Sequence, residues 1–350
     1  MATVAPEIKP DFSGPRKHFC FTDEHEALRE SIESFARKEL APHSEEWERD
    51  GFPDSVFKRM GELGFLGIHF PEEYGGQGGD YLMSIVRGEA MAQSANGGLN
   101  MGIAVHTDMA TPPILKFGSE YLKQTYLVPA IQGDKISSLG ISEPGAGSDV
   151  AGIRTRAVRD GDFYVINGAK TFITNGARAD FIVLVTKTDP DAGYDGFSLF
   201  VVDKDTPGFH VSKKLEKLGM HSSDTAELTF DDVRVPAENL LGEEGKGFYH
   251  IMWELQGERL IGAAGCVAGA QKAFDRTLQY ATERTAFGRP IGRFQAIRHK
   301  FADMATKIEA GRQMVYTTAW RFAGGEYPVR EISMAKLYTC LLYTSDAADE

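Results

Sequence analysis

The segment 136–241 constrains the fold of this chain most, because short β-forming stretches alternate there with turn-forming dipeptides. The dipeptides Asp160-Gly161, Asn167-Gly168 and Asn175-Gly176 readily supply the positive φ angles that tight turns require. Many short strands at this spacing predict a compact antiparallel barrel or sandwich. The predicted strands are 155–158, 163–166, 171–174, 181–186, 197–202, 209–211 and 226–230.

Apolar residues recur at three- and four-residue steps on both sides of this segment, which predicts helices. The first helix is expected to begin at a Thr22 cap and to end or kink at Pro42. Helix 248–281 carries several glycines and alanines, so we expect it to be buried among other helices. The other predicted helices are 54–63, 80–95, 100–117, 119–132, 294–322 and 329–340.

This order of elements predicts an α+β protein in which a β domain separates two helical domains. The ends of the chain are expected to differ from these domains in character. The predicted parts are a mobile arm (1–20), an N-terminal helical domain (21–135), a β-barrel domain (136–241), a C-terminal helical bundle (242–340) and an anomalous tail (341–350).

The composition excludes several classes of function. The chain has 50 acidic and 38 basic residues, and its net charge of −12 repels nucleic-acid phosphates; coenzyme A would need a local basic patch. Its three cysteines are far apart and form no Cys/His cluster, so we expect neither disulfides nor a metal site. No apolar run reaches the roughly 18 residues that span a bilayer, and the N-terminus has no apolar signal segment. We expect no membrane association, and a location in the bacterial cytoplasm or, in a eukaryote, the mitochondrial matrix.

Two glycine-containing segments are candidates for ligand binding. The segment 140–149 leaves a strand and turns at Gly145 and Gly147, where bare backbone amides could hold a heterocycle or a phosphate; a simple turn between strands is the alternative. The segment 168–176 has the pattern of an ordinary hairpin, with Phe172 and Thr174 on one face of its strand. That pair could cover and hydrogen-bond a ring, or could be a packed aromatic beside a surface hydroxyl.

Four long segments, in this order, resemble the acyl-CoA dehydrogenases: SEPGAGSD, GAKTFITNG, KLGMHSSDTAELTFDDVRVPAENLLG and ERTAFGRPIGRFQAIRHKFADMATKIEAGR. The resemblance covers about residues 20–340. It implies a helical N-terminal domain, a middle antiparallel β-barrel and a C-terminal four-helix bundle, with FAD between the last two. It also implies removal of two hydrogens across the α–β bond of an acyl-CoA, with an electron-transfer flavoprotein as the electron acceptor.

The resemblance further implies which residues bind FAD and substrate. Phe172 is expected against the isoalloxazine ring and Thr174 near its N5 atom. Residues at the flavin edge are expected to be Leu139, Ile141, Ser142, Gly147 and Ser148. The FAD of a partner chain is expected to meet Arg284, Phe287 and Gln295, so the enzyme should be a homodimer or homotetramer. Substrate contacts are expected from Ser148, Tyr249 and Arg259.

A glutamate is the expected catalytic base, because burial raises a carboxyl pKa from about 4.3 toward neutrality. Glu258, in the sequence Leu255-Gln-Gly-Glu258-Arg259, matches the position that the long-chain and isovaleryl-CoA dehydrogenases use. It shares a helix face with small or apolar residues such as Gly262, which is unlike a solvated face. The alternative base is Glu254, one turn earlier, and a charged surface pair is the other interpretation.

Some features of the chain depart from the family or stay open. The residues LLYTSDAADE (341–350) do not continue the helical pattern of 334–340, so we expect an incomplete bundle. A flavin monooxygenase on the same fold, a DNA-associated member and an inactive truncated member are the alternatives. Gly97, Gly98 and Gly102 could leave a deep acyl pocket that favours medium or long straight chains, or could serve helix packing.

Overall fold

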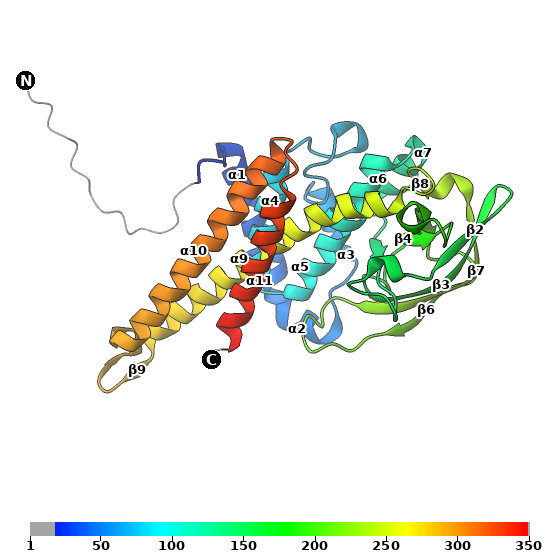
Figure 1. Ribbon diagram of the computed structural model, residues 1–350. Coiled ribbons are helices and arrows are strands. Elements are labelled where there is room, and N and C mark those ends of the chain that lie inside the picture. Colours follow the sequence, from blue (N-terminus) through cyan, green and yellow to red (C-terminus); the bar gives the residue numbers. More distant parts are fainter. Residues whose placement is uncertain (1–17, 349–350) are drawn as a thin grey trace, which may run out of the picture.

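The computed structural model describes residues 18–348, and the side chains of residues 18–342. Helices come first and last along the chain and a β-sheet lies between them, as predicted (Figure 1). The sheet occupies one end of the molecule. The long helix α9 extends from it toward the opposite end, and α10 runs back from that end beside α9 (Figure 1).

The N-terminal helices begin where the sequence predicts. Thr22 caps α1, and its backbone N–H donates to the ring of His25, which completes a capping box. A π-helical segment, Ala36–Leu40, follows α1, and Pro42 lies in the 3₁₀ turn, Ala41–His43, that leads into α2. The helices are α1 (Asp23–Phe35), α2 (Ser44–Asp50), α3 (Ser55–Glu62), α4 (Tyr81–Ala90), α5 (Gly97–Ala104), α6 (Thr111–Phe117), α7 (Glu120–Leu122) and α8 (Val128–Ile131).

The β domain is one connected sheet of eight strands in the order β6-β7-β3-β2-β4-β5-β8, with β1 beside β4. Most strand pairs of the sheet are antiparallel, as predicted, but β1 and β2 both run parallel to β4. Among the described strands, β6 and β8 form the two ends of this order. The strands are β1 (Ser137–Gly140), β2 (Arg156–Asp160), β3 (Phe163–Thr174), β4 (Phe181–Lys187), β5 (Phe197–Asp203), β6 (Phe209–Lys214), β7 (Thr225–Pro236) and β8 (Leu240–Leu241).

The tight turn predicted at Asn167-Gly168 is wrong, because both dipeptide residues lie inside the single strand β3. The pairing with β7 shifts register between Ile166 and Gly168, so the dipeptide forms an irregularity within the strand. A Cβ atom on Gly168 would lie 2.4 Å from Oγ1 of Thr155, and only glycine permits this approach. The turn at Gly161 is confirmed, since Asp160 pairs with Phe163 across it.

Strands β4 and β5 are buried on both faces, which holds the sheet in place between two apolar layers. Ile182 and Phe200 face a cluster shared with β3 and β7. Phe181 and Val201 face the opposite cluster, together with residues of α6, α8 and the first turns of α9. The sheet is thereby fixed against the helix that carries the candidate base.

The C-terminal part contains three described helices and a small hairpin of β9 (Thr285–Ala286) and β10 (Arg289–Pro290). The helices are α9 (Gly247–Glu283), α10 (Gln295–Ala323) and α11 (Val329–Ala348). The expectation that the helical pattern ends near residue 340 is wrong, because α11 continues to Ala348. In the described part, α4 of the N-terminal helices packs against both α9 and α10.

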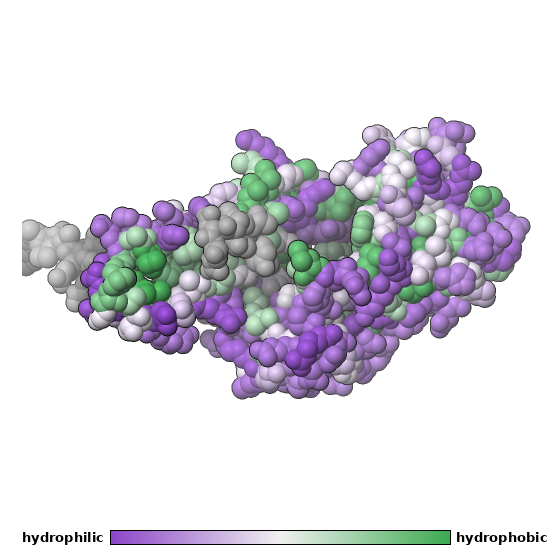
Figure 2. Space-filling model, turned by 90° about the horizontal axis from the view of Figure 1, so that it is seen from below, coloured by the Kyte–Doolittle hydropathy of each residue, from purple (hydrophilic) through white to green (hydrophobic). Residues whose placement is uncertain are grey.

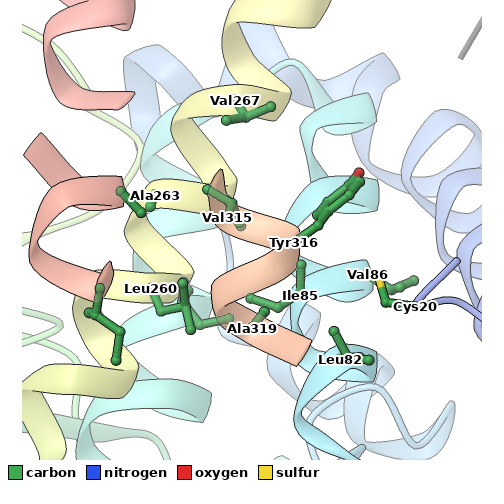
Figure 3. Packing of buried hydrophobic residues seen from close by; sticks show 14 of the residues in the cluster. Cys20, Leu82, Ile85, Val86, Leu260, Ala263, Val267, Val315, Tyr316 and Ala319 are labelled. Carbon is green, nitrogen blue, oxygen red and sulfur yellow. The ribbon is translucent and has the colours of Figure 1, made fainter. Parts of the chain in front are cut away.

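One apolar cluster joins the two helical parts (Figure 3). Leu82 and Ile85 of α4 meet Leu260 of α9 and Val315 of α10 there (Figure 3). Cys20 also lies in this cluster with 7% exposure, so the predicted mobile arm does not extend to residue 20. Residues 1–17 of that arm lie outside the described residues.

Candidate active site

Glu258 lies on α9 and its side chain is partly buried. Burial raises the pKa of its carboxyl group, although the positive charges of Arg259 and Lys336 act in the opposite direction. One turn further along, Gly262 is exposed, and a Cβ atom there would meet nothing within 4 Å. Glu258 is therefore a shielded carboxyl group next to open space along the helix.

Glu254, the alternative base, is more deeply buried than Glu258. Glu254 is only 2% exposed, and neither of its carboxyl oxygens has a hydrogen-bond partner. Burial, and then the nearby Glu258 carboxyl, raise the pKa of Glu254 well above its usual value. The structure thus places two coupled carboxyl groups one turn apart on the same helix.

The polar groups across from this helix form completed hydrogen bonds. The Tyr81 hydroxyl donates to the Gly257 carbonyl oxygen at 3.0 Å. The Arg87 guanidinium pairs with Asp108 at 2.5 Å, and both side chains are almost fully buried. Asp108 belongs to a π-helical segment, Val105–Ala110, that joins α5 to α6; such segments are frequent at functional sites.

The glycine-containing turn after β1 has the openness that a ligand needs. The backbones of Glu143 and Ala146 bond to each other in both directions, which closes the turn. A Cβ atom on Gly145 or Gly147 would meet nothing within 4 Å, and Ser148 is exposed beside them. This turn can therefore present backbone amides and a hydroxyl group to a bound molecule.

A buried ion pair that the sequence analysis missed supports this turn. The Lys170 ammonium group donates to the Ile141 carbonyl oxygen at 2.9 Å and to the Glu143 carboxylate at 2.8 Å. Glu143 also accepts hydrogen bonds from Thr155 and from the Arg154 backbone. Burial lowers the pKa of Lys170 to about 8, although Glu143 acts to raise it. Glu143 lies in the candidate segment 140–149 and Lys170 in the candidate segment 168–176. Nothing in the sequence of either segment indicates that the two residues form a pair.

Phe172 has a strained backbone and an exposed ring. Its φ angle is +61°, which is rare for an aromatic residue, and its side chain is 70% exposed. It lies at a second register shift between β3 and β7, from Lys170 to Ile173. Phe172 and Thr174 are more exposed than Thr171 and Ile173, in agreement with their predicted common face. Strain of this kind tends to persist where a ligand requires it.

Arg284, Phe287 and Gln295 lie at the far end of α9 and not near Glu258 (Figure 1). Arg284 is the C-cap residue of α9. It lies about 39 Å from Glu258 along the helix axis, because each helical residue adds about 1.5 Å. Phe287 occupies the tip of the β9–β10 hairpin with a φ of +50° and 95% exposure. The sequence analysis did not predict this hairpin.

The surface near the hairpin is apolar and hollowed. Figure 2 shows hydrophobic residues gathered at the end of the molecule where Figure 1 places β9. A pocket of about 510 Å³ lies beside β10, and its lining includes Leu278, Phe301 and the cations Arg293 and Arg298. This end of the chain offers contacts to another molecule.

The remaining predicted residues are spread around the first half of α9. Tyr249 is half-exposed, and Arg259 lies ten residues later on the same helix, about 15 Å along its axis. Leu139 and Ile141 are partly buried against the apolar layer between the sheet and α9. Ser142 is partly buried, and its carbonyl oxygen accepts from the backbone of Thr171.

Gly98 and Gly102 of α5 fit helix packing better than a deep acyl pocket, the two possibilities that the sequence left open. A Cβ atom on Gly98 would lie 2.2 Å from the Ser222 hydroxyl oxygen. One on Gly102 would lie 2.9 Å from the ring of Phe52. These glycines serve close packing, which was the alternative interpretation, and they give no information on acyl chain length.

Two negative findings apply to the described residues. No group of three or more His, Cys, Asp or Glu side chains there could hold a metal ion. No helix there combines the length and apolar character needed to cross a bilayer.

Three family models match consecutive parts of the chain. They are the acyl-CoA dehydrogenase N-terminal domain (residues 22–134), the middle domain (138–233) and the C-terminal domain (245–349). The last match includes most of the segment 341–350, which we expected to depart from the family.

Individual relatives agree with these matches. The chain is 43% identical over 330 residues to the probable acyl-CoA dehydrogenase YngJ of Bacillus subtilis (strain 168), covering 93% of this chain and 86% of that protein. It is 40% identical over 314 residues to the mitochondrial isovaleryl-CoA dehydrogenase of Solanum tuberosum, covering 89% and 76%. The crystal structure of acyl-CoA dehydrogenase from Geobacillus kaustophilus superimposes with a TM-score of 0.91 at 45% identity, covering 94% and 87%.

Proposed function

Because the chain belongs to the acyl-CoA dehydrogenase family, we propose that it oxidises the Cα–Cβ bond of an acyl-CoA thioester with Glu258 as the base and FAD as the hydride acceptor. The observation that carries this proposal is the shielded Glu258 carboxyl group with its raised pKa, beside open space on α9. The general activity follows from the family, and the identity of the base and the cofactor are the proposed parts.

Glu258 performs the proton transfer in this proposal. Its carboxylate takes the proton from the α carbon, and the raised pKa strengthens it as a proton acceptor. The positive charges of Arg259 and Lys336 limit this rise and favour the ionised form of Glu258, which is the form that acts as a base. The thioester would lie along α9, with contacts from Tyr249, Arg259 and Ser148.

The residues of the sheet fit FAD. The Phe172 ring stands exposed at a strained position, and the turn at Gly145 and Gly147 has room for a bound group. Ser142, Ser148 and Thr174 offer hydroxyl donors, and Leu139 and Ile141 offer apolar contact. When bound, FAD supplies the acceptor for the hydride that leaves the β carbon.

A second copy of the chain would complete the site. Arg284, Phe287 and Gln295 are too distant from Glu258 to serve the same cofactor within one chain, and Phe287 is almost fully exposed. We propose that they contact the FAD of a partner subunit in a homodimer or homotetramer. An electron-transfer flavoprotein is the proposed acceptor of the electrons.

We expect the FAD-loaded protein to lose its flavin absorbance when mixed anaerobically with acyl-CoA and no NADH. This reduction needs only the substrate and the base. A monooxygenase on the same fold would leave the flavin oxidised until a nicotinamide reductant is added. Absorbance of the flavin in a stopped-flow instrument separates the two, and a flavin that only NADH reduces would contradict the proposal.

We expect Phe172→Gly to change stability and FAD affinity in opposite directions. The left-handed φ at Phe172 strains the folded protein by about 1–3 kcal/mol, and glycine relieves this strain. Glycine also loses more conformational entropy on folding, which offsets about 0.5–1 kcal/mol of that gain. The FAD-free protein should therefore gain about 1 kcal/mol in urea unfolding. FAD should bind more weakly in a fluorescence titration, since the ring is lost. The control Phe163→Gly, on the same strand at an ordinary φ, should only destabilise the protein; equal behaviour of both variants would remove Phe172 from the site.

A further inference from the structure

The buried carboxyl groups of the described residues follow a pattern with one exception. Five aspartate or glutamate residues are buried, and each of four forms an ion pair with a basic side chain. The fifth is Glu254, with 2% exposure and no hydrogen bond to either oxygen. The four pairs are Glu89–Arg29 at 2.8 Å, Asp108–Arg87 at 2.5 Å, Glu143–Lys170 at 2.8 Å and Asp224–Arg178 at 2.7 Å.

The polar groups that other elements bring near Glu254 already have partners. Tyr81 and Asp108 interact electrostatically with Glu254, while on α9 itself Glu258 raises the pKa of Glu254 and Arg259 lowers it. The Tyr81 hydroxyl donates to a backbone carbonyl oxygen, and Arg87 and Asp108 bond to each other. An unpartnered buried carboxyl group is unfavourable, so its place here calls for a hydrogen-bonding partner from outside the chain.

Glu254 faces the same side of α9 as the base. Residues four apart on a helix have Cβ atoms about 5–6 Å apart on one face, which puts Glu254 within reach of a substrate that contacts Glu258. Burial and the neighbouring Glu258 raise its pKa well above the usual value and so favour the protonated form. A protonated carboxyl group offers one O–H donor and one acceptor, which match an uncharged hydroxyl or oxo group and not a cation.

We propose that Glu254 is a specificity-determining residue whose carboxyl group hydrogen-bonds a hydroxyl or oxo group on the acyl chain, about one helical turn from the reacting carbons. This inference rests on the proposed function, because it requires the acyl chain to lie beside Glu258. It predicts that a suitably substituted acyl-CoA reacts better than the plain chain of equal length.

The test compares octanoyl-CoA with a series of hydroxyoctanoyl-CoAs in which the hydroxyl group moves along the chain beyond the β carbon. We expect one isomer to exceed octanoyl-CoA in kcat/KM by about tenfold with the FAD-loaded wild-type enzyme. Glu254→Leu should abolish that ratio, because it removes both donor and acceptor. Glu254→Gln should retain much of it, because an amide also donates and accepts.

The control is Asp275→Asn, an exposed carboxylate on α9 that should leave both kcat/KM values unchanged. The proposal is overturned if no isomer exceeds octanoyl-CoA in kcat/KM with the wild-type enzyme. It is also overturned if Glu254→Leu lowers kcat/KM equally for octanoyl-CoA and for the hydroxylated isomer, as expected for a carboxyl group that only packs or binds water. The wild-type isomer series decides the matter even if Glu254→Leu fails to fold. Failure of octanoyl-CoA to reduce the flavin would instead contradict the proposed function.

Discussion

Glu258→Gln is expected to lower the rate of flavin reduction by acyl-CoA by about 10²–10⁴-fold, the usual contribution of a general base. Glutamine has the same shape as glutamate but cannot accept the α-proton, so FAD and acyl-CoA should still bind. Stopped-flow absorbance after anaerobic mixing measures the rate, and titration of the oxidised enzyme measures binding.

The pH profile gives a second readout of the same variant. The base must be ionised, so the wild-type rate should rise with pH through the pKa of Glu258, which lies above the ordinary glutamate value. This acid limb should be absent in Glu258→Gln, and Asp275→Asn should keep it. If Glu254→Gln stops reduction and Glu258→Gln does not, the base is Glu254.

Lys170→Met is expected to cost about 3–5 kcal/mol in the free energy of unfolding, because it leaves the Glu143 carboxylate buried without its cation. The Ile141 carbonyl oxygen also loses its donor, so the turn after β1 should loosen and FAD should dissociate more readily. Denaturant unfolding measures the first effect, and the flavin content of the purified protein measures the second.

Two comparisons identify the ion pair as the cause. The double variant Lys170→Met, Glu143→Gln should regain much of the stability, because no unpaired charge remains. Lys58→Met breaks an exposed pair with Asp134 and should cost no more than about 1 kcal/mol. A Lys170→Met variant as stable as Lys58→Met would show that the buried pair contributes little.

The pattern of apolar residues predicted most of the fold, since the elements with strong periodicity are those with a buried face. Helix α9 extends beyond its predicted range by only a few residues, and β4 and β5 were found from their apolar runs. The errors concern long-range geometry. Nothing local in Asn167-Gly168 distinguishes a hairpin from an irregularity inside a strand, because the close approach of Thr155 decides between them.

The candidate site was predictable from the sequence only through resemblance, and the reason is physical. The sequence alone does not distinguish Glu258 from Glu254, because both are glutamates one turn apart on the same helix. Their burial depends on elements packed against α9, among them α4 and the π-helical segment, which are distant in sequence. The Lys170–Glu143 pair likewise depends on how β3 lies beneath the turn after β1. The strain at Phe172 comes from its backbone conformation, which cannot be predicted from a phenylalanine in the sequence.

The apolar cluster of Figure 3 has a consequence for synthesis of the chain on the ribosome. Glu89 on α4 accepts a hydrogen bond from the Tyr316 hydroxyl, 227 residues later in sequence. At about 5–20 residues per second, the first helices to emerge wait roughly 10–50 s for the partners that cover them. During that interval the apolar side of α4 stays uncovered, so we expect the early helices to be open to aggregation and to chaperone binding.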